Sequence, residues 1–236
     1  MRVLALDTTT RGGSVALVED DRVVAQSGSD PSQSHAERLP LDLLRLLDEA
    51  GVPLSAIDGF AAASGPGSFT GLRIGIATIQ GLAFVTRRRV APVSALEALA
   101  HDASRGLDAG SLVAAWIDAR RLDVYSALYR VADGPLFSAA RLVEVDPPSV
   151  ARPAETLERW RSRFGVPAVV AADPAIACAA EAAATARVVG LPLLAGTIGL
   201  LAVDRATRGE TVDPAGVQPL YVRRPDAEMA RERARR

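Results

Sequence analysis

Lysine, asparagine, cysteine and aromatic residues are scarce or absent in this sequence of 236 residues. All 27 basic residues are arginine, which excludes a Schiff-base lysine, the lysine of a phosphate-binding P-loop and the lysine of a kinase strand. The single cysteine, Cys178, excludes an internal disulfide and favours a reducing compartment. The two histidines, His35 and His101, lie far apart in the sequence, so we expect no metal site.

The chain also lacks a charge excess and a long apolar run. Its 27 basic and 28 acidic side chains give a net charge of −1, which disfavours a protein that coats nucleic acid by itself. The longest uncharged run of the C-terminal half, residues 188–203, is shorter than the roughly 20 residues of a membrane span and contains Gly and Pro. The N-terminus enters an apolar run at Val3 without the leader of a secreted protein. We therefore expect a cytoplasmic protein without membrane contact.

What is present is an ordinary globular composition, with 49% apolar and 23% charged residues. Because aromatic residues make up only 4%, the core must be aliphatic. The length corresponds to one large domain or two small lobes, at about 100–200 residues per domain.

The hydrophobic pattern of the first half predicts three strands in a meander, followed by helices and a fourth strand. Apolar runs and turn residues predict strands at 3–7, 14–19, 22–27 and 60–64. An amphipathic pattern predicts a helix over 34–50, with its apolar residues within an arc of about 160°. A nearly all-apolar helix is predicted from Leu72 to Val85.

The second half repeats this order, beginning with an apolar strand at 112–118 that ends in Asp118. We therefore expect an α/β fold of two facing lobes, each a mixed sheet flanked by helices, although two β-meanders can also resemble each other by chance. The predicted division places residues 1–104 in the first lobe, completed by a C-terminal helix at 197–209. Residues 105–196 form the second lobe, and 223–236 form an Arg-rich, mobile tail.

Two loops carry candidate binding groups. The run Asp7-Thr8-Thr9-Thr10 puts a carboxylate and three hydroxyls on a turn, where they could hold a nucleotide phosphate or a metal–water shell. Asp and Thr are also common turn residues whose side chains bond their own backbone. The loop Gly65–Gly71 (GPGSFTG) joins a strand to a helix, so its amides and the helix dipole suit an anion. Its alternative role is a tight, capped turn with glycines for close packing.

The helix after this loop offers more apolar surface than one sheet face needs, which favours either a partner interface or a thick core. Gly71 and Gly75 would let a neighbouring helix approach closely, and Arg73 and Gln80 share one face. For His35 a surface or capping role is expected.

The sequence resembles the TsaB family in six segments, which are VLALDTTTRGGSVAL, SHAERLPLDLLRLL, ASGPGSFTGLRIGIATIQGLA, APVSALEALA, IDARRLDVYSALY and PLYVRRPDA. The resemblance covers nearly the whole chain and is most specific over residues 64–76. It implies the two-lobed fold shared by actin, sugar kinases and Hsp70. The segment Ala171–Pro174 departs from the Gly-rich turn that is frequent in the family, which weakens the case for a complete nucleotide site.

The resemblance implies a partner role. TsaD, with TsaB and the ATPase TsaE, transfers threonylcarbamoyl to the adenosine beside the anticodon of tRNAs that read codons beginning with A. TsaD needs an HxxxH metal site, and the corresponding positions here are Ala95 and Leu99, whose side chains bind no metal. We therefore expect a non-catalytic subunit that partners a TsaD-like catalytic subunit and a TsaE-like ATPase. It needs no cofactor, could dimerise when alone, and meets tRNA only indirectly or through its tail.

Two groups of site residues follow. The nucleotide or anion group, for which ATP or ADP binding is left open, comprises Asp7, Thr8, Thr9, Thr10, Gly65, Gly67 and Ser68. The partner group comes from the two helices through which TsaB-like proteins dimerise or bind TsaD. It comprises His35, Arg38, Leu39, Leu43, Leu46, Gly71, Leu72, Arg73, Gly75, Ile76, Ile79 and Gln80. The alternatives are an ATPase or small-molecule kinase that uses Asp7 and Asp118, and, less well supported, a metallopeptidase.

Overall fold

A computed structural model describes residues 1–172, 187–190 and 193–223. Cys178 and the predicted tail beyond residue 223 lie outside the described residues, as does a helix that the Ala-rich pattern predicts over 174–186.

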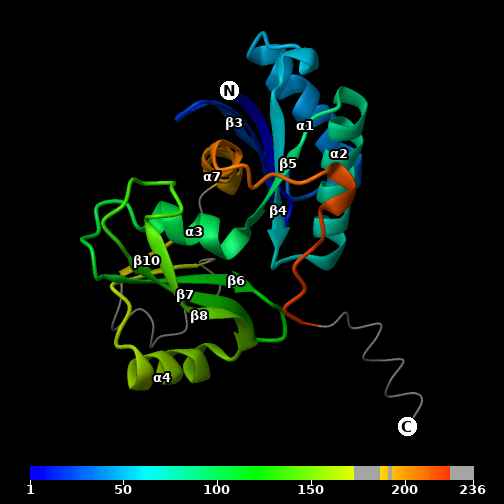
Figure 1. The fold of residues 1–236 in the computed structure, drawn as a ribbon. Coiled ribbons are helices and arrows are strands. Elements are labelled where there is room, and N and C mark those ends of the chain that lie inside the picture. The colour runs from blue at the N-terminus through cyan, green and yellow to red at the C-terminus, as the bar shows by residue number, and fades with distance from the viewer. Residues whose placement is uncertain (173–186, 191–192, 224–236) are drawn as a thin grey trace.

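Two five-stranded sheets with the same topology form two lobes (Figure 1). The strand order is β3-β2-β1-β4-β5 in the first sheet and β10-β9-β6-β7-β8 in the second. In each sheet the first strand in sequence pairs antiparallel with the second and parallel with the fourth. This shared order confirms the predicted duplication and the two-lobed α/β fold.

Strands β1 to β4 and β6 lie close to the predicted positions, whereas β5 and β10 were not predicted. Those of the first sheet are β1 (Arg2–Asp7), β2 (Ser14–Glu19), β3 (Arg22–Gly28), β4 (Gly59–Gly65) and β5 (Val90–Ser94). Those of the second are β6 (Leu112–Asp118), β7 (Val124–Val131), β8 (Leu142–Ala151), β9 (Val169–Ala171) and β10 (Arg187–Val189).

Four helices cover the two faces of the first sheet: α1 (His35–Glu49), α2 (Phe69–Thr86), α3 (Ala95–Ala103) and α7 (Leu194–Thr207). The helix α4 (Pro153–Arg163) packs on the second sheet. Figure 1 shows α1 and α2 on the outer side of the first sheet, α3 and α7 between the lobes, and α4 outside the second lobe.

The side chains of β1 explain why this strand lies in the middle of the molecule. Val3 and Ala5 belong to the apolar cluster that α3 and α7 share, whereas Leu4 and Leu6 belong to the cluster beneath α1 and α2. Successive side chains of a strand point to opposite faces, so an apolar run is needed when both faces are covered.

Three features differ from the sequence prediction. β5 and α3 form a parallel strand and a helix that the pattern did not specify. The apolar pattern also predicted a strand from Leu136 to Val145, but β8 begins only at Leu142, because residues 135–141 form turns closed by hydrogen bonds such as Ser138 N–H to Pro135 O. α2 begins at Phe69, three residues early, because the Ser68 hydroxyl accepts the Gly71 N–H at 3.2 Å and caps the first turn.

Of the helices in the described part of the chain, α2 alone has the length and apolar composition of a membrane span, with a mean hydropathy of 1.3 over 18 residues. One face of α2 packs on β4 and carries buried residues such as Leu72 and Ile79, so the helix is part of the first lobe.

A buried histidine lies between the lobes. His101 of α3 is 1% exposed, and its Nδ1 has no hydrogen-bond partner among the described residues. Its ring lies 6.2 Å from the ring of Phe137. Burial lowers the pKa of His101 to about 4. The carboxylate of Asp204 opposes this shift, whereas Arg141 and Arg205 reinforce it.

This histidine makes stability depend on pH. The unfolded chain takes up the proton near pH 6.5, but the folded chain does so only near pH 4, so stability is complete above 6.5 and falls between these values. We expect His101 to account for a loss of about 3 kcal/mol in the free energy of unfolding over this interval. Urea unfolding of the wild type and of His101→Leu at pH 7, 6, 5 and 4 measures this loss. Equal losses in both proteins would contradict the assignment.

Candidate functional site

A cleft of about 980 Å³ lies between the two lobes. On the first lobe its walls are the loop after β1, the GPGSFTG loop and the first turn of α1. On the second lobe the wall is the turn between β6 and β7, and residues 220–223 close one side. The cleft is therefore built from elements that the duplication places opposite each other.

The predicted anion-binding residues divide into two sets. Thr9, Thr10, Gly67 and Ser68 line the cleft. Asp7, Thr8 and Gly65 are buried behind this wall, which corrects their assignment as contact residues.

The carboxylate of Asp7 is used inside the protein. Its Oδ1 accepts the Thr9 N–H at 2.8 Å and the Thr9 hydroxyl at 2.6 Å. Burial raises the pKa of Asp7, and the two bonds from Thr9 oppose that rise. Because Asp7 is only 3% exposed, its side chain stabilises the turn after β1 and is not presented to a ligand in the cleft.

The glycines of the GPGSFTG loop and of α2 allow close packing. A Cβ on Gly71 would lie 2.1 Å from the carbonyl oxygen of Thr8, and a Cβ on Gly75 would lie 2.2 Å from the Thr8 hydroxyl. The Ser68 N–H donates to the Thr9 carbonyl at 2.8 Å. These contacts fit the packing role of the GPGSFTG loop, because the Ser68 amide of this loop bonds to the β1–β2 loop and is not directed at a ligand.

His35 and Arg38 in the first turn of α1 also hold the β1–β2 loop. Arg38 donates from Nη2 to the Arg11 carbonyl at 2.8 Å and to His35 Nδ1 at 2.9 Å. Since arginine cannot accept, Nδ1 must be unprotonated, and His35 Nε2–H donates to the Thr10 carbonyl at 2.9 Å. Burial lowers the pKa of His35; the bond to Thr10 opposes this shift, and the charge of Arg38 acts in the same direction as burial.

Both side chains thus support the β1–β2 loop, and their predicted part in a partner interface stays a prediction. His35 lies at the cleft wall but is committed to the loop, and Arg38 is only 3% exposed. The sequence pattern of α1 did indicate that His35 and Arg38 are in contact, because polar residues three apart in a helix lie side by side.

Most of the predicted apolar partner residues lie in the interior of the first lobe, which is a correction to the sequence analysis. Only part of the predicted arc of α1 faces the sheet, and this part carries Leu39, Leu43 and Leu46, because their burial stabilises the helix. The buried members are Leu39, Leu43, Leu46, Leu72, Ile76 and Ile79, together with Gly71 and Gly75. A charge placed at Leu43 or Ile76 would therefore unfold the lobe rather than block a partner selectively.

The two polar residues of α2 hold the C-terminal segment. The Arg73 guanidinium lies 3.9 Å from the centre of the Phe69 ring, and its Nε donates to the Tyr221 hydroxyl at 3.0 Å. Gln80 donates from Nε2 to the Pro214 carbonyl at 2.9 Å. Their shared face is therefore partly covered by residues of the same chain.

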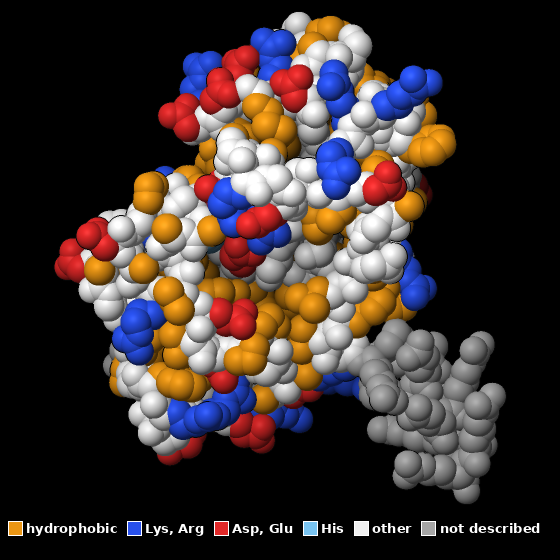
Figure 2. Space-filling model, in the orientation of Figure 1, with side chains coloured by type: hydrophobic (Ala, Val, Ile, Leu, Met, Phe, Trp, Pro, Cys, Tyr) orange, Lys and Arg blue, Asp and Glu red, His pale blue; other side chains and the backbone are white. Residues whose placement is uncertain are grey.

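The apolar side chains that do face outward on these helices were not the ones selected from the sequence. Phe84 and Val85 of α2 are 79% and 78% exposed, and Leu41 and Leu44 of α1 are also exposed. Figure 2 shows apolar side chains along the edge of the molecule that α2 forms. The amphipathic pattern of α1 grouped the exposed Leu44 with buried residues, because Leu44 directly follows the buried Leu43 in the sequence.

The described residues contain no group of three or more His, Cys, Asp or Glu side chains that could hold a metal ion. Ala95 and Leu99 of α3 are fully buried among apolar side chains. Nucleotide binding in the cleft stays a prediction.

The architecture defines the class of protein. The fold resembles an activator of 2-hydroxyisocaproyl-CoA dehydratase from Clostridium difficile, solved with bound ADPNP, at a TM-score of 0.52 and 12% identity over 89% of this chain and 97% of that one. It resembles a putative N-acetylmannosamine kinase from Listeria monocytogenes equally well, at a TM-score of 0.51. The chain therefore has the actin-like, sugar-kinase-like ATPase fold.

Sequence comparisons give the family. The model of TsaD, tRNA N6-adenosine threonylcarbamoyltransferase, matches residues 25–152. TsaB of Escherichia coli, a tRNA threonylcarbamoyladenosine biosynthesis protein, is 42% identical over 130 residues, which are 55% of each chain. A Pseudomonas aeruginosa protein, described as similar to the peptidase YeaZ, superposes with a TM-score of 0.76 and 34% identity over 94% of this chain and 99% of that one. The chain belongs to the TsaB family.

The length of the match differs among relatives. The chain spans about half the length of the named TsaB proteins it matches. An uncharacterised protein of Mycobacterium tuberculosis is 31% identical over 231 residues, covering 95% of this chain and 93% of that one.

The packing role of Gly71 gives a direct test. We expect Gly71→Ala to lower the free energy of unfolding by about 1–3 kcal/mol, because the added methyl group would overlap the backbone of Thr8. Gly81 of the same helix is the matched control, since a Cβ there meets nothing within 4 Å. Gly81→Ala should stabilise the protein by up to about 1 kcal/mol. Urea unfolding measures both, and an unchanged or raised stability in Gly71→Ala would refute the close approach.

Proposed function

We propose that this chain is a non-catalytic partner subunit in the synthesis of threonylcarbamoyladenosine in tRNA. It docks on a TsaD-like catalytic subunit, and a TsaE-like ATPase acts on the assembled pair. The modified adenosine lies beside the anticodon of tRNAs that read codons beginning with A. The proposal draws on the family to which the chain belongs and on the function stated in the names of its TsaB relatives.

The observation that carries the proposal is the outward apolar surface of α1 and α2. Among the described residues, three of the four most exposed large hydrophobic side chains are Phe84, Val85 and Leu44, all on these two helices. Exposed apolar side chains that gather on neighbouring helices are typical of interaction sites in soluble folds. Burying it stabilises a complex by about 25 cal/mol per Å² before the costs of association.

Three buried residues outside the cleft lining support a non-catalytic role. Asp7, which follows the first strand, is buried and bonded to Thr9. The positions that correspond to the TsaD metal ligands hold Ala95 and Leu99, which offer no donor atom. A transferase mechanism needs charge stabilisation at the reacting group, and these positions supply none.

The same surface can serve two partners in turn. A two-fold arrangement of two identical chains would bury α1 and α2 of each against the other, and a related catalytic subunit would replace one copy. We propose that the free chain self-associates weakly and that the catalytic subunit outcompetes the second copy.

A charge on the outward surface should block the complex without unfolding the chain. We expect Phe84→Glu to weaken binding to the TsaD-like subunit of the same organism by at least about 100-fold, because it removes an exposed aromatic anchor and buries a charge on docking. The matched control is Leu122→Glu, since Leu122 is equally exposed, at 79%, but lies on the second lobe.

Size-exclusion chromatography and calorimetric titration of the two purified subunits measure the effect. The proposal predicts a complex with the wild type and with Leu122→Glu, and separate peaks with Phe84→Glu. A complex of unchanged affinity with Phe84→Glu would refute the assigned surface, and the absence of any complex with the wild type would refute the function.

A further inference from the structure

The last described residues of the chain, 210–223, cross from one lobe to the other. They begin on the first sheet, where Val212 and Val90 pair as an antiparallel bridge with N–H···O distances of 2.8 and 3.0 Å. Val217 is buried in the apolar cluster of α1 and α2. This end of the segment is therefore an integral part of the first lobe.

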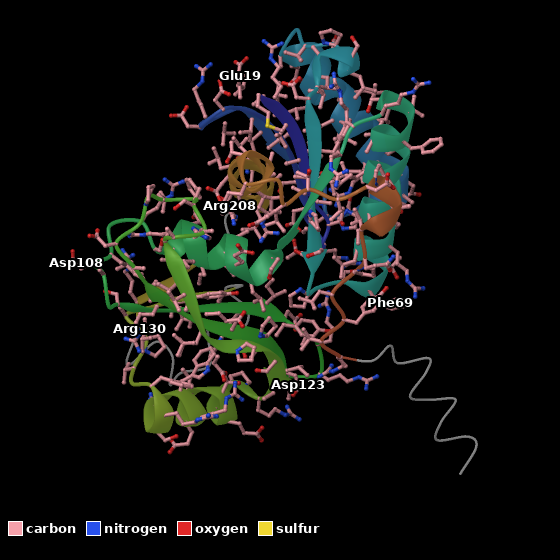
Figure 3. The ribbon with its side chains drawn as sticks, viewed as in Figure 1. Glu19, Phe69, Asp108, Asp123, Arg130 and Arg208 are labelled. Carbon is pink, nitrogen blue, oxygen red and sulfur yellow. The ribbon has the colours of Figure 1, made fainter. Side chains whose placement is uncertain are left out.

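The middle of the segment is fixed to the GPGSFTG loop and to α2. The Leu220 N–H donates to the Ser64 carbonyl at 2.7 Å. The Tyr221 ring lies 5.1 Å from the Phe69 ring, and its hydroxyl accepts the hydrogen bond from Arg73. Figure 3 shows Phe69 where α2 begins, beside this part of the segment.

At the far end of the segment, the side chain of Arg223 binds to the second lobe. Arg223 donates from Nη1 to the Ala119 carbonyl at 2.9 Å, and its Nη2 pairs with the carboxylate of Asp123. Both side chains are about four-fifths buried, with exposed fractions of 19% and 23%, so solvent screens this pair only weakly. A charge-assisted bond of this kind is stronger than a neutral one.

The turn that receives Arg223 is conformationally strained. Arg120, Arg121 and Leu122, which lie between Ala119 and Asp123, have φ values of 62°, 57° and 66°. Side chains with a Cβ seldom occupy this region, and they persist there only where the surroundings hold them. Arg223 bonds to both ends of the turn and is one of the groups that hold it.

We propose that residues 210–223 form a strap that sets the separation of the two lobes, and that the bonds of Arg223 to Ala119 and Asp123 fasten it. Residues 220–223 of the strap also line the cleft, so the fastening limits how wide the cleft opens, together with the buried apolar cluster that joins the lobes. Release of Arg223 frees the second lobe from the strap while the bridge at Val212 stays in place. This inference does not rest on the proposed function.

A second arginine provides a matched control. Arg152 pairs through Nε with the same carboxylate of Asp123 at 3.3 Å, but it belongs to the second lobe, directly before α4. Loss of Arg152 removes a partner of Asp123 without releasing the strap. Figure 3 places Asp123 on the second lobe, close to the end of the described chain.

The experiment measures the distance between the lobes in the full-length chain. Nitroxide labels on cysteines introduced at Asp48 and Glu158, on the exposed faces of α1 and α4, report the separation by pulsed electron resonance, with Cys178 replaced by serine in every sample. We expect Arg223→Ala to lengthen and broaden the distance distribution. The amides of residues 119–123 should also exchange with deuterium at least about tenfold faster. Arg152→Ala should change neither distance nor exchange to this extent.

A second variant tests whether the effect of Arg223→Ala comes from the lost ion pair or from a local folding defect at Arg223. Asp123→Asn keeps the shape of the side chain and weakens its charge pair, so it should shift the distance in the same direction as Arg223→Ala. An unchanged distance in both variants, or an equal change in Arg152→Ala, would overturn the strap.

Discussion

The close approach of α2 to the loop after β1 is the constraint on which the rest of the structure depends. Gly71 and Gly75 leave room for the backbone and hydroxyl of Thr8, and no other residue fits there without displacing them. This contact places the GPGSFTG loop, and the Ser68 amide meets the carbonyl of Thr9. The polar groups that the sequence offers to a ligand are thereby largely committed to one another.

Three polar side chains of the first lobe are committed to contacts within the protein. The carboxylate of Asp7 bonds to Thr9, while His35 and Arg38 support the loop after β1. Phe84 and Val85, by contrast, are apolar and are 79% and 78% exposed near the C-terminal end of α2. The proposed function assigns association to this surface.

The sequence predicted the fold better than it predicted the site. Alternating apolar residues set the strands, and the repeated order predicted two lobes, because periodicity follows directly from local geometry. The same periodicity does not separate Leu43 from Leu44, which are about 100° apart around α1, yet Leu43 is buried and Leu44 is exposed. Contacts between distant segments, such as Arg223 with Asp123, have no local signal and required the structure.

The most direct test measures threonylcarbamoyladenosine by mass spectrometry of bulk tRNA in cells that depend on this gene. Cells would carry either Phe84→Glu on the outward surface or Asp118→Asn in the cleft, both checked for equal protein levels. The account predicts that the modified nucleoside disappears in the first strain and stays at the wild-type level in the second. Loss of the nucleoside with Asp118→Asn and its retention with Phe84→Glu would contradict it.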